Sequence, residues 1–115
     1  MNREKLIPIT LLVLDVDGVL TDGAIVYSGG GEESKAFNVR DGHGLKLVMR
    51  AGIGVALLTA RESKAVLHRA RDLGINDVYQ KATDKIAAYA TILLDKRSRI
   101  KTSAMSVTIS LTFRY

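Results

Sequence analysis

Short apolar runs and amphipathic segments alternate along residues 1–95. Runs rich in Ile, Val and Leu occupy Ile9 to Leu14, Ile53 to Leu58 and Val78-Tyr79, and each is typical of a buried strand. Between these runs the apolar residues recur at helical spacing, and Gly52 and Gly74 stand where the first two helices should end. Strands that alternate with helices predict an α/β fold with a Rossmann-like parallel sheet flanked by helices.

Three helices are expected from the apolar spacing. The first opens at Asp41-Gly42 and has an apolar side formed by Leu45, Val48 and Met49. The second is capped by Ser63, and its buried stripe is Val66, Leu67, Ala70 and Leu73. The third is capped by Thr83, and its buried stripe is Ile86, Ala87, Ala90, Leu93 and Leu94.

A β-hairpin is predicted between the first strand and the first helix. Its strands are Ala24 to Tyr27 and Ser34 to Val39, and the segment between them contains three consecutive glycines, Gly29 to Gly31. The hairpin is therefore an insertion in the alternating pattern.

Composition limits the classes of protein that fit. The chain has 115 residues, no cysteine and a formal net charge of +5. One domain is expected, without disulfides or a thiol nucleophile. The apolar runs are too short to span a bilayer, and the N-terminus lacks a signal-type segment, so a cytoplasmic protein is expected. Aromatic residues are too scattered to suggest binding of nucleic acid.

Two carboxylates follow the first strand, in the segment from Leu14 to Gly23, LDVDGVLTDG. The carboxyl ends of parallel strands are where ligands collect in such sheets. A simple turn or helix cap is the alternative interpretation of Asp15 and Asp17, because Asp and Gly are common turn residues. The segment resembles that of the haloacid dehalogenase-like phosphatases. Residues 37–46, FNVRDGHGLK, narrow the resemblance to the small, capless sugar-acid phosphatases of that superfamily.

The resemblance implies roles for the acidic segment. Asp15 is the nucleophile and a metal ligand, and Asp17 is the general acid/base and binds the metal through its backbone carbonyl. Gly18 lets the backbone approach the phosphate. The implied cofactor is Mg²⁺, a hard cation that a few carboxylates, waters and a substrate phosphate can hold.

Two further segments match the family pattern. Thr59, at the end of the second strand, is expected to bind the phosphoryl group, and a local cap is the alternative. The lysine that neutralises the phosphate is expected to be Lys85, with Lys81 as the alternative. Arg61 is expected either to bind a substrate carboxylate or to form a surface ion pair.

The segment at residues 37–46 carries two more candidates. Arg40 and Lys46 are expected to bind the acid group of the substrate or to lie at a subunit interface. In the family, hairpins from several subunits pack together, so a homotetramer through residues 24–39 is expected.

The resemblance implies Mg²⁺-dependent hydrolysis of a phosphorylated 2-keto-3-deoxy sugar acid through an aspartyl-phosphate. The preferred substrate is 3-deoxy-D-manno-octulosonate 8-phosphate, a precursor in lipopolysaccharide synthesis, and the alternative is a nonulosonate 9-phosphate. A non-catalytic remnant that binds phosphate or a partner subunit is the alternative from another class. A phospho-accepting receiver domain fits poorly, because its acceptor Asp would stand where Thr59-Ala60-Arg61 lies.

The periodic pattern ends after Asp95. Residues 1–95 are therefore expected to form an incomplete, C-terminally truncated phosphatase core, and residues 96–115 an aberrant tail that is either disordered or an edge strand. The G-D-D-x-x-D motif of the family is missing, and a permitted reading of the codons in a shifted phase restores it. We therefore expect a frameshift between Lys96 and Ile100, with weak Mg²⁺ binding, low activity and poor solubility as its consequences.

Overall fold

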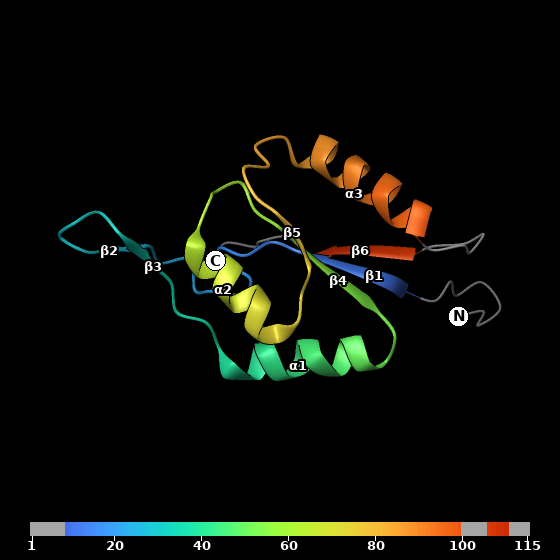
Figure 1. Ribbon diagram of the computed structural model, residues 1–115, viewed down its shortest axis with the longest axis horizontal. Coiled ribbons are helices and arrows are strands. Elements are labelled where there is room, and N and C mark those ends of the chain that lie inside the picture. The colour runs from blue at the N-terminus through green and yellow to red at the C-terminus, as the bar shows by residue number, and fades with distance from the viewer. Residues whose placement is uncertain (1–8, 100–105, 111–115) are drawn as a thin grey trace.

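The computed structural model describes residues 9–99 and 106–110, and its elements follow the expected alternation (Figure 1). The strands of the main sheet are β1 (Ile9–Leu14), β4 (Gly54–Leu58), β5 (Asp77–Tyr79) and β6 (Ser106–Ser110). The hairpin strands are β2 (Val26–Tyr27) and β3 (Glu33–Ser34). The helices are α1 (Val39–Arg50), α2 (Lys64–Leu73) and α3 (Lys85–Arg99).

The main sheet is parallel throughout and has the strand order β5-β4-β1-β6. At its centre, Leu12 of β1 pairs with Val55 of β4 on one side and with Thr108 of β6 on the other. The predicted parallel α/β sheet is confirmed, and all carboxyl ends of its strands point to the same edge.

Helices cover both faces of the sheet, with α1 and α2 on one side and α3 on the other (Figure 1). Alternation along the strands divides the core into two apolar layers. The layer under α1 and α2 is built around Leu14, Val55 and Leu57, and the layer under α3 is built around residues such as Leu11, Val13 and Ala56.

Helix α1 begins earlier than the sequence indicated. It starts at Val39, because the Asn38 side chain accepts a hydrogen bond from the Arg40 amide at 2.8 Å and caps the helix. Gly42 therefore lies inside the first turn, where a Cβ atom would meet the Arg69 guanidinium and stand 3.0 Å from Cδ2 of Leu73. The glycine thus allows α2 to pack closely against α1.

Helix α2 has the predicted Ser63 cap, and Gly74 ends it in a left-handed conformation with φ of 79°. Leu67, which was expected in its buried stripe, is 45% exposed. Val66 and Ala70 face the sheet, and Leu67 is turned away from them by one helical step.

Helix α3 differs more from its prediction. Asp84 rather than Thr83 caps it, accepting from the Ala87 amide at 3.1 Å. Its buried side carries Ala88, Tyr89 and Ile92, whereas Ile86 is 84% exposed and Leu94 is 70% exposed. The helix is apolar around most of its circumference, so the spacing of its apolar residues did not show which side faces the sheet.

The hairpin is shorter than expected, since its strands have two residues each. Its turn closes through a hydrogen bond from the Gly31 amide to the Ser28 carbonyl, and Gly31 has a φ of 83°. In Figure 1 the hairpin extends away from the sheet and its helices.

Strand β6 lies at one edge of the described sheet, where it pairs with β1. Helix α3 continues to Arg99, past the domain boundary expected at residue 95. Residues 100–105 and 111–115 of the expected tail lie outside the described residues.

Candidate active site

The acidic loop lies directly after β1, at the carboxyl edge of the sheet. The Val16 side chain is fully buried in the core, and its carbonyl accepts hydrogen bonds from the amides of Val19, Leu20 and Thr21. Gly18 has a φ of 83°, a conformation that favours glycine. The anchored Val16 thus holds Asp15 and Asp17 at the sheet edge.

Lys85 reaches this edge from the first turn of α3. Its Nζ lies 2.7 Å from Oδ2 of Asp15, although the two residues are 70 positions apart in sequence. Lys81 instead pairs with Glu62 at 3.2 Å, and both of those side chains are largely exposed. Of the two candidate lysines, the structure therefore brings Lys85 to the carboxylate.

Thr59 directly follows β4 and is 2% exposed. Its amide donates to the Tyr79 carbonyl at 2.9 Å, and its carbonyl accepts from the Ala82 amide at 3.0 Å. Its hydroxyl accepts from the Arg61 amide at 3.4 Å and keeps its own proton for donation to another group. The residue thus joins the loops that follow β4 and β5.

A second cation, Lys35, was not recognised in the sequence. Its Nζ lies 2.5 Å from Oδ1 of Asp17 and 3.0 Å from Oε1 of Glu33, and its side chain is 1% exposed. The available signal was the two-residue spacing of Glu33 and Lys35, which places both on one face of an extended chain.

Arg61 completes this group of charges. Its Nη2 donates to Oε2 of Glu33 at 2.8 Å and to the Tyr27 hydroxyl at 3.0 Å. The hydrogen bond from Arg61 and then the ion pair with Lys35 lower the pKa of Glu33. Burial alone would lower the pKa of Lys35, but its hydrogen bond to Asp17 and its ion pair with Glu33 outweigh that effect and raise it.

Arg40 and Lys46 lie on α1 with exposed side chains. The contact of Arg40 with Asn38 uses its backbone amide, which completes the helix cap. These two residues thus stand on a helix surface, whereas Asp15, Asp17, Thr59 and Lys85 gather where β1 and β4 end.

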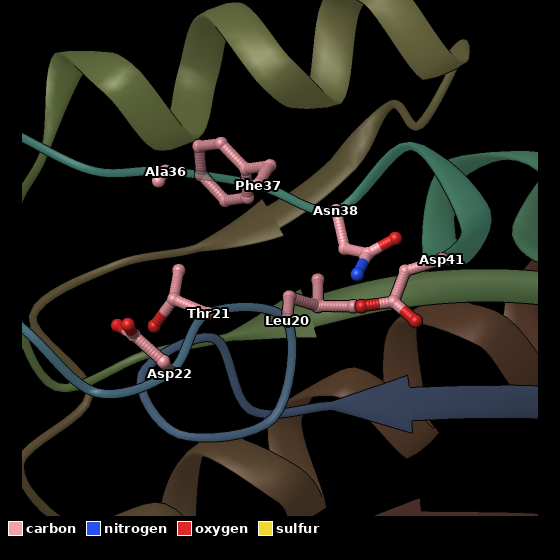
Figure 2. A pocket seen from close by; sticks show the side chains of 7 residues that line it. All are labelled: Leu20, Thr21, Asp22, Ala36, Phe37, Asn38 and Asp41. Carbon is pink, nitrogen blue, oxygen red and sulfur yellow. The ribbon is translucent and has the colours of Figure 1, made fainter.

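A cavity of about 360 Å³ opens between the acidic loop and the start of α1. Figure 2 shows Thr21 and Asp22 on one side of it and Phe37 and Asn38 on the other. The Arg69 guanidinium lies 5.8 Å from the centre of the Phe37 ring and donates to the Asn38 carbonyl. The wall formed by residues 36–38 is therefore fixed to α2.

Within residues 9–99 and 106–110, no group of three His, Cys, Asp or Glu side chains could hold a metal ion. Asp15 nevertheless provides a carboxylate, and Asp17 a backbone carbonyl, on the same loop. Mg²⁺ keeps several waters and uses one or two carboxylates together with a substrate phosphate, so these two residues supply a minimal set of protein ligands for the ion.

No family model matches the chain. A 3-deoxy-D-manno-octulosonate 8-phosphate phosphatase, KdsC, from Yersinia pestis is 48% identical over 85 residues, which are 74% of this chain and 46% of that protein. The chain therefore spans about half the length of the curated relatives that it matches.

Solved structures similar to this chain belong to the same group of phosphatases. A HAD superfamily (subfamily III A) hydrolase from Legionella pneumophila is 39% identical with a TM-score of 0.77, covering 88% of this chain and 53% of its own. The 3-deoxy-D-manno-octulosonate 8-phosphate phosphatase from Moraxella catarrhalis, in complex with magnesium, phosphate and KDO, is 41% identical with a TM-score of 0.72, covering 86% and 56%. This chain therefore has the haloacid dehalogenase-like fold and is related, over about half of their length, to the KdsC phosphatases of that superfamily.

Proposed function

We propose that this chain has the chemistry of a phosphoric monoester hydrolase that removes phosphate from 3-deoxy-D-manno-octulosonate 8-phosphate. The observation that carries the proposal is the Asp15 carboxylate at the end of β1, with the Lys85 ammonium 2.7 Å away. The similarity to the KdsC phosphatases supports the substrate class. A nonulosonate 9-phosphate is the alternative substrate. In this proposal the setting is cytoplasmic synthesis of lipopolysaccharide precursors.

In the proposed reaction, an oxygen of Asp15 attacks phosphorus and the bond from phosphorus to the sugar oxygen breaks. Asp17 gives a proton to the leaving sugar hydroxyl and later takes one from the water that hydrolyses the aspartyl-phosphate. Lys85 and the Thr59 hydroxyl bind the phosphoryl oxygens. Asp15 and the Asp17 carbonyl would hold Mg²⁺, which supplies positive charge against the phosphate.

The proposal is tested by phosphate release from a panel of sugar-acid phosphates, with and without Mg²⁺. Asp15→Asn should abolish release, whereas Asp72→Asn, a change at an exposed acid on α2, should leave it unchanged. Release that survives Asp15→Asn would remove Asp15 from the role of nucleophile. Among the described residues, no third acid joins Asp15 and Asp17 to form a metal site. Mg²⁺ should therefore bind weakly, and we expect slow turnover.

That small donor set also favours a second candidate, a protein that binds phosphate or a partner subunit without turnover. Measuring phosphate binding and phosphate release together distinguishes the two functions. Saturable binding of inorganic phosphate, weakened by the Lys85→Met substitution and not accompanied by any phosphate release, would establish the second candidate.

We also propose that the hairpin forms a contact between subunits of a homotetramer. Three consecutive apolar side chains on it are exposed, Ile25 by 38%, Val26 by 57% and Tyr27 by 58%. Exposed apolar groups along a hairpin strand are typical of a surface that another chain covers.

A further inference from the structure

Lys35 is a charged side chain in a nearly closed environment. Its side chain is 1% exposed, and its ammonium group contacts the carboxylates of Asp17 and Glu33. Burial of an unpaired ammonium group is strongly unfavourable, and the two carboxylates offset that cost. Lys35 lies just after β3, whereas Asp17 belongs to the loop after β1.

The contacts continue beyond Glu33. Arg61, which follows β4, binds Glu33 at 2.8 Å and the Tyr27 hydroxyl of β2 at 3.0 Å. A continuous chain of polar contacts therefore joins Tyr27, Arg61, Glu33, Lys35 and Asp17. We call this set the hairpin brace, because it ties the hairpin to the ends of β1 and β4.

We propose that Lys35 is a positioning residue that holds the Asp17 carboxylate in one orientation, and that Glu33 and Arg61 hold Lys35 in turn. The proposal rests on the proposed function for the role of Asp17 in proton transfer. One Asp17 oxygen is bound by Lys35, so the carboxylate is restrained against rotation. Lys35 itself is enclosed by protein and acts through Asp17.

The physical link is tested first by hydrogen exchange on the whole chain, a measurement that needs no turnover. Lys35→Met should speed amide exchange in residues 16–34 by about tenfold or more, while the amides of β4 and α2 stay protected. Lys35→Arg keeps the charge and should restore most of the protection. Lys64→Met, at an exposed lysine on α2, is the matched control and should change nothing.

The role in proton transfer is tested by comparing two leaving groups. An alkyl phosphate needs a proton on its leaving oxygen, whereas a nitrophenyl phosphate needs little help. Lys35→Met should therefore lower kcat/KM, which reports only the steps up to loss of the leaving group, by about 100-fold for the alkyl ester and by only about threefold for the nitrophenyl ester. A residue that only supports the fold would lower both rates equally.

The two measurements separate the two proposals. Unchanged exchange in Lys35→Met would overturn the hairpin brace, and equal loss for both leaving groups would overturn positioning of Asp17. A chain that releases no phosphate from any ester would contradict the proposed function. In that case the exchange experiment still decides whether Lys35 restrains the loop.

Discussion

Lys81 and Lys85 are four positions apart, but the backbone gives them different surroundings. Lys85 begins α3 and reaches Asp15, whereas Lys81 has a positive φ of 58° and pairs with Glu62. Lys85→Met should therefore weaken binding of inorganic phosphate by about tenfold, because a charge-assisted contact is lost. Lys81→Met should change it by less than about twofold, and equal effects in a calorimetric titration would contradict the assignment.

The ionisation of Glu33 should make the stability of the fold depend on pH. Its folded pKa is lowered from the ordinary value of 4.5, first by Arg61 and then by Lys35. Its contribution to stability is therefore complete above pH 4.5 and is lost as the pH falls through the lower folded pKa.

Glu33→Gln should accordingly lower the free energy of unfolding by about 1 kcal/mol at pH 7. The difference from the original chain should shrink as the pH falls below 4.5. Urea unfolding at several pH values measures this, and a difference that stays constant down to acid pH would contradict the ion-pair interpretation.

At the scale of residues, the sequence predicted best where a motif stands beside a strand. The segment around Asp15 and Asp17 was located because an apolar run precedes it. Lys35 was missed because its partners Asp17 and Glu33 meet only after the hairpin folds back over the loop. Arg61 was named as a candidate for an ion pair, but its partner Glu33, 28 positions away, could not be identified from the sequence.

The orientation of α3 is the clearest feature at the scale of elements. Lys85 points to the sheet edge, and Ala88, Tyr89 and Ile92 follow on the same side at helical spacing. Contact with Asp15 thus indicates which side of an almost uniformly apolar helix faces the sheet.

Two identical substitutions test this orientation. Ile92→Ala should lower the free energy of unfolding by about 2–4 kcal/mol, because it empties a fully buried position. Ile86→Ala, at a position that is 84% exposed, should change it by less than about 0.5 kcal/mol. Chemical denaturation of both variants measures the difference, and similar losses would mean that the helix is rotated.

The sequence predicted which elements exist more reliably than where they begin. Helix α2 was placed well, because Ser63 and Gly74 mark its two ends by capping. Helix α1 was placed too late, since Asn38 is inconspicuous as a cap within a segment interpreted as a strand. The hairpin strands were predicted too long because β-branched and aromatic residues continue beyond the paired positions.

At the scale of the whole molecule, the parallel sheet followed directly from the alternation of strands and helices. The pairing of β6 with β1 could not be inferred, because residues distant in sequence meet there. β6 also forms an edge of the described sheet, and exposed edges favour association between chains.

The predicted assembly through the hairpin can be tested separately from such association. Val26→Glu places a charge on an exposed apolar position of the hairpin and should convert tetramers to smaller species. Ile86→Glu, an equivalent change on α3, should leave the assembly intact. Sedimentation velocity measures both, and a tetramer that survives Val26→Glu would exclude this surface.

The ion pairs at the sheet edge have a further consequence for how anions approach. Asp15, Asp17 and Glu33 are balanced there by Lys85, Lys35 and Arg61, so these six groups together carry no formal net charge. A neutral patch adds little long-range attraction of its own, so the dependence of phosphate-ester capture on ionic strength should come from the net charge of +5 on the whole chain. Discrimination at this edge then comes from short-range fit after the molecules meet, rather than from electrostatic guidance beforehand.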